Sequence, residues 1–301
     1  MKQNRIVNII FFLILGMTCF AQISGVVIDK ETKQPIPYVN IYVLNTKNGA
    51  TSNVDGKFII NDYITGNEVI ITSIGYCSKI VRLYDTNNII YLIPKTYEIQ
   101  EFVVEPRKYK NELLVNVIKK NQVNTHFKTT RPAIVAKYFN FQPKYNDLKY
   151  LKNVKLITKS EISGAKFNLR LFYPNSTGEP GEDILAENIY VEVKKGERLI
   201  TIDLSNKNIS FPKNGFFVAL EWLIVDTNKK EFNYTQTIDN KKVKTYSYDP
   251  EFGGILKEIY PNTWNYNGGV WRKGAALNIE KSGKKIKERY FDLAIAITLT
   301  D

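Results

Sequence analysis

The sequence predicts an all-β protein made of two β-sandwich domains joined by a short amphipathic helix. Short apolar–polar alternations separated by turn residues fill residues 23–104, and they recur beyond residue 131. Only the segment between these regions has apolar residues at helical spacing. The chain has 301 residues, 44% of them apolar and 13% aromatic, which is enough for two packed cores.

Residues 1–21 have the layout of a cleaved secretory signal. Lys2 and Arg5 precede a nearly unbroken apolar run over residues 6–20, and the small residue Ala21 follows. The run is shorter than the ~20 residues that span a bilayer as a helix. We therefore expect export to the periplasm, to the outer membrane or out of the cell. The alternative, acylation of Cys19 in a lipoprotein, fits less well because larger residues precede that cysteine.

The basic charge of the chain predicts a solvated, lysine-rich surface. The formal net charge is +12, and loss of Lys2 and Arg5 lowers it to +10. The lysines are scattered, with small groups at 241–242 and 284–287 beside expected turns. We expect no nucleic-acid partner, and the alternative is attraction to anionic lipid or polysaccharide.

Cys77 is the only cysteine outside the leader, so the sequence predicts no intramolecular disulfide. It follows Tyr76 in an apolar segment. We expect a packed, unreactive thiol there.

Residues 22–105 are predicted to form the first sandwich. Between residues 38 and 43, Val39, Ile41 and Val43 alternate with polar and tyrosine side chains. Asp55-Gly56 predicts a turn before the next strand, and residues 67–76 and 89–94 supply further strands.

Residues 106–130 are predicted to form a connector helix. Its apolar residues recur at steps of one and four, namely Leu113, Leu114, Val117 and Ile118. His126 would then be an exposed residue near the helix end.

Residues 131–301 are predicted to form the second sandwich. Residues 189–194 and 199–204 alternate, whereas residues 215–225 are apolar on both faces, as in a central strand. Residues 174–183 have the composition of a loop, and residues 290–300 indicate one buried strand.

The first region resembles a known family. It contains Gly25-x-Val27-x-Asp29, Thr32 and Pro35-Ile36-Pro37, followed by Thr51, Asp55-Gly56-x-Phe58 and Ser73-Ile74-Gly75-Tyr76. This pattern resembles the carboxypeptidase regulatory-like domain, a prealbumin-like β-sandwich of Bacteroidota-type cell-envelope proteins. The region after residue 131 is similar in layout to the jelly-roll-like sandwiches that follow such domains.

The resemblance implies structural roles and brings no catalytic residue. We expect Gly56 to adopt the positive φ of a tight turn and Asp55 to bond the turn backbone. We expect Gly25 and Gly75 to allow close approach between sheets.

The sequence offers little for metal or nucleophilic chemistry. A zinc carboxypeptidase needs two histidines and a carboxylate, and this chain has one histidine, His126. Ser163 and Lys166 match the Ser-x-x-Lys pattern, but no Lys-Thr-Gly follows, so we expect a turn. We predict no cofactor, no metal and no enzyme activity.

Glu221 lies among apolar neighbours and shares its strand face with Phe217, Ala219 and Leu223. Burial would raise its pKa and suit a glycosidase acid. The favoured interpretation is a structural pair with a lysine or arginine across the sheet.

Four aromatic residues gather between residues 259 and 273 among asparagines and glycines. Exposed, they would form a glycan-binding platform, but we favour rings that close the end of a sandwich core. They are Tyr260, Trp264, Tyr266 and Trp271.

Taken together, the sequence predicts a non-catalytic, exported cell-envelope protein that binds or scaffolds. Its expected partner is an envelope protein or a polysaccharide, with peripheral association at the outer membrane as a further possibility. One alternative is a carboxylate-dependent hydrolase such as a glycosidase. A second alternative is an outer-membrane receptor component, although residues 131–301 are too few to form a large receptor barrel.

Overall fold

The computed structural model describes residues 22–61, 63–84, 86–95, 111–235, 242–260, 262–276 and 288–301. Within these ranges the chain is all-β, and its helical segments are three-residue 3-10 turns, which confirms the predicted fold class. No helix in the same ranges has the length and apolarity needed to cross a membrane. The predicted leader, residues 1–21, lies outside the described residues.

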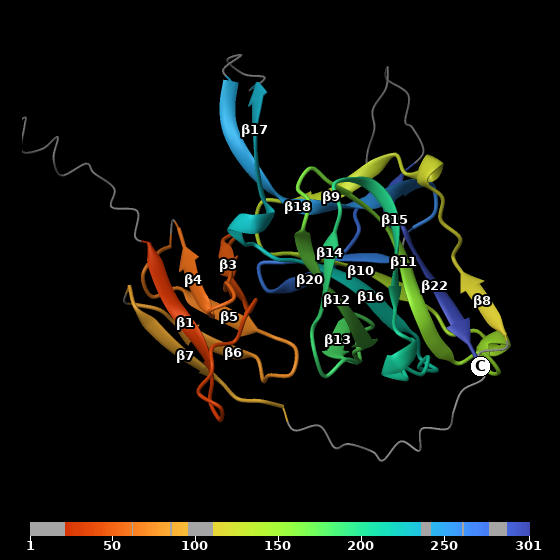
Figure 1. Ribbon diagram of the computed structural model, residues 1–301, viewed down its shortest axis with the longest axis horizontal. Coiled ribbons are helices and arrows are strands. Elements are labelled where there is room, and N and C mark those ends of the chain that lie inside the picture. Colours follow the sequence, from red (N-terminus) through yellow and green to blue (C-terminus); the bar gives the residue numbers. More distant parts are fainter. Residues whose placement is uncertain are drawn as a thin grey trace, which may run out of the picture.

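The first domain is a sandwich of a three-stranded and a four-stranded sheet (Figure 1). In sheet order the strands are β4 (Lys57–Ile60), β1 (Ile23–Asp29) and β7 (Asn88–Leu92), then β3 (Gly49–Thr51), β2 (Asn40–Val43), β5 (Glu68–Thr72) and β6 (Lys79–Arg82). Alternate residues point inward to one core, among them Val27, Ile41, Ile71 and Leu92. The predicted strands of this region are present.

The second domain is a sandwich of a seven-stranded and an eight-stranded sheet. The first contains β13 (Pro180–Asp183), β12 (Ala165–Pro174), β16 (Phe216–Trp222), β10 (Ile134–Phe139), β19 (Thr263–Asn267), β20 (Val270–Lys273) and β14 (Ile189–Val193). The second contains β17 (Lys229–Thr235), β18 (Lys242–Lys257), β11 (Tyr150–Ser160), β22 (Ile295–Thr300), β8 (Glu112–Val115), β15 (Gly196–Asp203), β21 (Tyr290–Leu293) and β9 (Thr125–Thr129).

Strand β16 lies between β12 and β10, and all seven of its residues are buried. One face of β16 points into the core between the two sheets, and the other carries a smaller apolar cluster on the outside of its sheet. The prediction of a central strand is confirmed. The hairpin of β17 and β18 projects from the body of the domain (Figure 1).

The predicted connector helix is wrong for the described residues from 111 onward; residues 106–110 lie outside them. Residues 112–115 form strand β8, which pairs with β22, and β9 follows after a single 3-10 turn, η1 (Lys120–Gln122). Leu113 packs on the main core, whereas Leu114 is exposed, as alternation along a strand requires. Pairing with β22 packs Leu113 and Val115 against the main core, whereas an isolated short helix is marginal in water.

Two further segments differ from the prediction. The predicted loop at residues 174–183 ends in strand β13, which pairs with β12. The predicted single strand over residues 290–300 is divided at Ala294, because β21 pairs with β18 whereas β22 pairs with β11.

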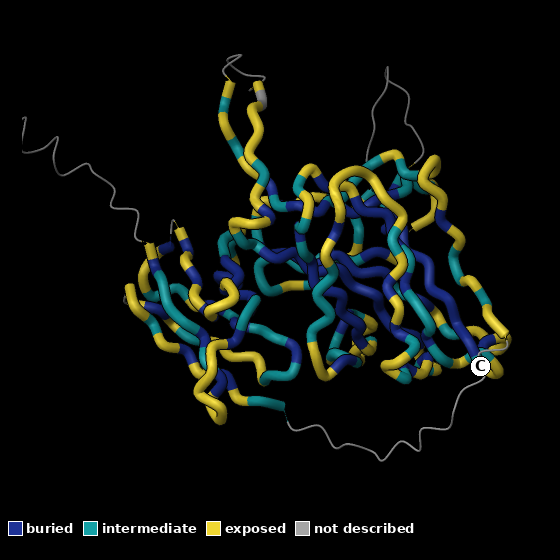
Figure 2. The backbone as a smooth tube through the Cα atoms, in the orientation of Figure 1, coloured by how far each residue is buried: buried dark blue, intermediate teal, exposed yellow. Residues whose placement is uncertain are grey.

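The first domain packs on the outer face of the seven-stranded sheet, and buried backbone lies on both sides of the contact (Figure 2). The Thr51 hydroxyl accepts a hydrogen bond of 3.0 Å from the Ile224 backbone N–H. The rings of Tyr42 and Tyr266 meet edge to face, with centroids 5.1 Å apart. In the β19–β20 turn, a side chain on Gly268 would come within 2.5 Å of the Thr46 carbonyl oxygen. The two backbones therefore approach closely there.

Candidate functional site

A cleft of about 280 Å³ lies between the two domains. The wall from the first domain carries hydroxyl groups of Thr72, Ser73, Tyr76 and Ser78. The wall from the second domain carries charged and aromatic side chains, namely Arg170, Glu182, Asp183, Phe172, Tyr266 and Trp271. A concave site at a domain boundary with convergent polar groups is a common place for a ligand.

Arg170 on β12 organises the charged wall. Its Nε and NH2 atoms donate to the two carboxylate oxygens of Asp183 at 3.0 and 2.7 Å. Its NH1 atom donates to Glu221 at 2.9 Å. Burial disfavours the charged guanidinium, but the two carboxylates outweigh that effect and raise the pKa of Arg170 above its usual value.

Glu221 is held by a second bond, because the side-chain amide of Asn168 donates to its other oxygen at 3.0 Å. Arg170 and Glu221 are 6% and 3% exposed, so this is a buried ion pair. The predicted pairing of Glu221 with a basic residue across the sheet is confirmed. The arrangement satisfies the buried carboxylate of Glu221 and the half-buried carboxylate of Asp183 with one guanidinium, whose planar fork suits such geometry.

The four aromatic residues of segment 259–273 divide into two groups. Tyr266 on β19 and Trp271 on β20 lie with ring centroids 5.0 Å apart, and both line the cleft. Trp264 packs edge to face against Phe217 in the outer apolar cluster. Tyr260 is 51% exposed. Three of the rings thus cover the outside of the seven-stranded sheet, where the first domain sits.

Two hydroxyl groups at this boundary are buried without a hydrogen-bond partner among the described residues. One is the Ser73 hydroxyl in the cleft wall, and the other is the Tyr42 hydroxyl. Burial, with a smaller contribution from Glu221, raises the pKa of Tyr42 well above its usual value. Such unpaired groups are costly, so they favour a ligand or water that bonds them.

The predicted turn residues lie away from the cleft or at its margin. Gly56 has φ +71° in a turn, and Asn53, rather than Asp55, bonds that turn through its side chain, accepting from the backbone N–H groups of Asp55 and Lys57. A side chain on Gly25 would come within 2.5 Å of the Asn88 carbonyl oxygen. Gly75 has φ +84° and lies against Ala186 of the second domain.

His126 and Cys77 are not placed as predicted. His126 lies in strand β9, not at a helix end, and its Nε2 atom is 3.3 Å from a carboxylate oxygen of Glu197. Cys77 is exposed rather than packed, because the chain after Tyr76 leaves the core to reach β6. Ser163 and Gly164 lie in the β11–β12 turn, as expected, and Lys166 follows in β12. No three His, Cys, Asp or Glu side chains of the described ranges cluster as a metal site requires.

Arg170 and Asp183 are the site residues that the sequence did not indicate. Arg170 has apolar neighbours in its strand, and a buried arginine in such a run is a signal of a buried carboxylate partner. Asp183 carries no comparable signal, because the residues before it include Gly and Pro.

Residues 23–104 match the family model described as the CarboxypepD_reg-like domain. That domain is a non-catalytic, prealbumin-like module, and further β-rich structure follows it here. No curated protein matches the chain. The resemblance of the first domain is thereby confirmed, and it is compatible with a binding role.

Proposed function

We propose that this protein is a non-catalytic, exported binding protein of the cell envelope that holds a saccharide unit in the cleft between its domains. One observation carries the proposal. Tyr266 and Trp271 line a cleft whose opposite wall presents hydroxyl groups, including that of Ser73, which has no hydrogen-bond partner in the described part of the chain.

The chemistry of the two walls suits a sugar. An aromatic ring contacts the apolar face of a sugar ring, while hydroxyl and carboxylate groups bond its hydroxyls. Glu182 is exposed at the cleft and supplies an acceptor. The volume lies just below the ~300–1,000 Å³ of typical small-molecule sites, which favours one sugar unit over a long chain.

The state of the acidic residues supports binding rather than turnover. A glycosidase needs one carboxyl group to give a proton and a second to act as base or nucleophile. Asp183 and Glu221 both accept charge-assisted hydrogen bonds from Arg170, so each carboxylate is already engaged by a fixed partner.

A hydrolase is the second candidate, because Glu182 and Asp183 line the cleft and Glu221 lies behind its wall, bonded to Arg170. It predicts release of sugar from envelope polysaccharide by the wild type and loss of release in Glu221→Gln. Binding without release would favour the first proposal.

Export rests on the leader-like residues 1–21 and is tested separately. Fractionation of the producing cell should place the chain outside the cytoplasm, with Gln22 near its new N-terminus by mass spectrometry. A cytoplasmic, full-length product would contradict export without bearing on the cleft.

The binding experiment uses residues 22–301 and isothermal titration calorimetry. The probes are glucose, galactose, N-acetylglucosamine and the polysaccharide fraction of the producing cell's envelope. We expect Trp271→Ala to weaken binding at least about tenfold, in keeping with the ~1–3 kcal/mol of a well-buried contact.

Tyr260→Ala is the matched control, because Tyr260 belongs to the same aromatic segment but is exposed and away from the cleft. It should leave the affinity unchanged. Equal affinity of wild type and Trp271→Ala, or no binding of any probe, would overturn the saccharide proposal.

A further inference from the structure

The outer face of sheet β4-β1-β7 is largely apolar, and no other described part of the chain covers it. One sheet of the first domain is covered by the second domain, but this sheet lies on the opposite side (Figure 1). Its outward-facing Ile59, Ile89, Tyr91 and Ile93 are 55%, 62%, 40% and 49% exposed. Outward positions of such a sheet are normally polar, so a contiguous apolar set indicates an interaction surface.

The strand register places the apolar residues of β1 and β7 side by side, with Ile59 of β4 at the margin beside Ser24 and with Lys57 beside Val26. On the other side of β1, Val26 lies beside Ile89 and Ile28 beside Tyr91. Val26 and Ile28 are half-buried between the exposed side chains. We call this surface, formed by Val26, Ile28, Ile59, Ile89, Tyr91 and Ile93, the outer apolar face.

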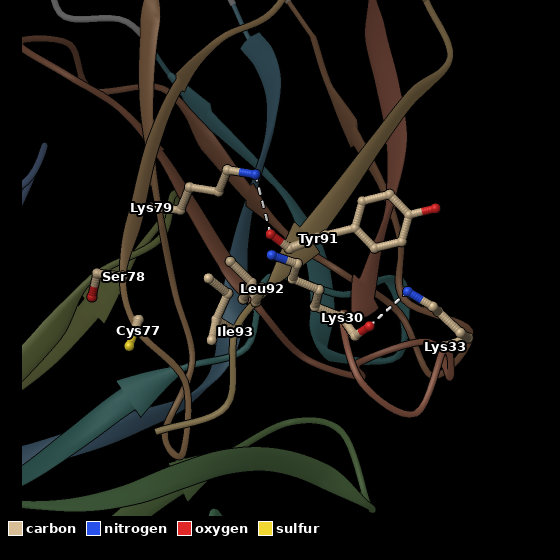
Figure 3. Close-up of a pocket in the computed structure, with 8 residues that line it drawn as sticks. All are labelled: Lys30, Lys33, Cys77, Ser78, Lys79, Tyr91, Leu92 and Ile93. Atoms are coloured by element: carbon tan, nitrogen blue, oxygen red, sulfur yellow. Dashed lines mark hydrogen bonds between the residues drawn. The ribbon is translucent and has the colours of Figure 1, made fainter. Parts of the chain in front are cut away.

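A cavity of about 620 Å³ opens at one end of the outer apolar face (Figure 3). Leu92, Ile93 and Cys77 supply apolar lining, and Tyr91 lies beside them. The cavity lies beside β7, an edge strand of its sheet. An apolar side chain from a partner would have room to enter.

Three lysines surround this cavity. Lys79 donates to the Tyr91 carbonyl oxygen at 3.1 Å, and Lys33 donates to the Lys30 carbonyl oxygen at 2.7 Å (Figure 3). The Lys33 ammonium also lies 5.3 Å from the centre of the Tyr91 ring. Among the residues that the structure describes, no acidic residue lines the cavity and no carboxylate pairs with any of the three lysines. Their charge is therefore available to a partner.

From these features we propose that the outer apolar face and its cavity dock an extended segment of a partner protein in which carboxylates alternate with apolar side chains. The carboxylates would meet Lys30, Lys33 and Lys79, while the apolar side chains would cover Ile89 and enter the cavity. Charge complementarity of this kind sets orientation and association rate.

Other occupants fit less well. A flat lipid surface cannot enter the cavity, and Lys79 reaches across the cavity to the Tyr91 carbonyl oxygen (Figure 3). A second copy of the chain meeting this face through the same face would set its lysines against identical lysines, which is repulsive. A strand of a partner could also pair with β7, as edge strands allow, if it displaced Lys79 from Tyr91.

The test uses residues 22–301 and a fluorescein-labelled peptide that alternates glutamate with valine. Fluorescence anisotropy should show binding that weakens as salt rises, because exposed charges are screened. A peptide with serine in place of valine should bind at least about tenfold more weakly, since it loses apolar burial. A peptide with lysine in place of glutamate should not bind.

Charge-reversed variants locate the contact. Lys30→Glu combined with Lys33→Glu and Lys79→Glu should weaken peptide binding at least about tenfold, given up to ~1 kcal/mol for each exposed pair. The matched control reverses three exposed lysines of the second domain, namely Lys194, Lys195 and Lys213. Because the proposal does not depend on the saccharide cleft, Trp271→Ala should bind the peptide normally.

Cys77 supplies a footprint, as the only cysteine of residues 22–301. Saturating peptide should slow its labelling by a maleimide at least about tenfold, as expected for a thiol covered by a bound segment. Binding that neither protects Cys77 nor distinguishes the two triple variants would overturn the proposal. So would binding to vesicles containing phosphatidylglycerol, with loss in the triple variant, in the absence of peptide binding.

Discussion

Arg170 and Asp183 form a two-bonded ion pair between β12 and β13, with both carboxylate oxygens within 3.0 Å of guanidinium nitrogens. The pair forms part of the cleft wall, and the same guanidinium also satisfies Glu221. One side chain therefore neutralises two carboxylates beneath the first domain. Removing the Arg170 guanidinium should therefore lower the stability of the protein, because both carboxylates would be left without a positive partner.

Replacing Arg170 by methionine should destabilise the protein by about 3–5 kcal/mol, the usual cost of breaking a buried pair from one side. Urea unfolding followed by tryptophan fluorescence would measure this as a lower free energy of unfolding for the second domain, which contains all three tryptophans.

The control for Arg170→Met adds Asp183→Asn and Glu221→Gln, which remove the uncompensated charges. We expect the triple variant to recover most of the lost stability, because neutral amides bury at lower cost than carboxylates. A loss below about 1 kcal/mol in the single variant would show that the pair is not the fixed element we describe.

Acid should weaken the first domain through Asp29. Its carboxylate accepts from the backbone N–H groups of Thr32 and Glu31 and from the Tyr76 hydroxyl. The Thr32 bond contributes most, and with the other bonds it outweighs burial and lowers the pKa of Asp29. The resulting stability is present above the unfolded pKa of about 3.9 and is lost as pH falls through the lower, folded pKa.

Asp29→Asn supplies the comparison, because it cannot ionise. The difference in free energy of unfolding between wild type and this variant should be constant above about pH 5 and shrink below about pH 4. Urea titrations at several pH values would measure it. A difference that widens toward acid would contradict the lowered pKa of Asp29. Burial first, and then the hydrogen bond to Asp29, raise the pKa of Tyr76 to about 12. The Tyr76 hydroxyl is therefore protonated at neutral pH and can donate to Asp29.

Tyr42→Phe should leave stability unchanged or increase it by up to about 1 kcal/mol. The Tyr42 hydroxyl is buried and has no hydrogen-bond partner among the described residues, so its removal relieves an unpaired group. Tyr42→Ala should cost about 3–5 kcal/mol, because it removes the ring that packs on Tyr266. Thermal unfolding would compare them, and equal losses would contradict this account.

Native Cys77 should react with a small disulfide reagent at nearly the rate found in urea, since the thiol is exposed. Absorbance of the released thiolate would measure both rates. If Cys77 reacted about a hundredfold or more slowly in the native protein than in urea, the thiol would be packed, as the sequence predicted.

The strands of both sandwiches were predictable because burial imposes a period on them. Residues 216–222 are apolar on both faces, and both faces are covered, one by the core and one by the cluster under the first domain. That Glu221 needs a basic partner also follows from its neighbours. Which residue fills that role does not, because Arg170 lies 51 positions away and the pairing depends on strand order.

The remaining errors come from contacts that sequence spacing does not encode. Leu113 and Leu114 fit a helix as well as a strand, and the edge of β22 decided between them. The sequence alone did not show whether the rings of Tyr266 and Trp271 are exposed, because residues of the other domain supply part of their surroundings. Asp183 became a strand residue only because β12 extended far enough to pair with it.

Strands β1 and β7 run side by side in the same direction, with Gly25 beside Asn88 and Asp29 beside Leu92. A pull applied between residues 22 and 95 would load this pair in shear, so its hydrogen bonds would have to rupture together rather than in succession. The first domain is therefore arranged to resist tension applied between its two chain ends.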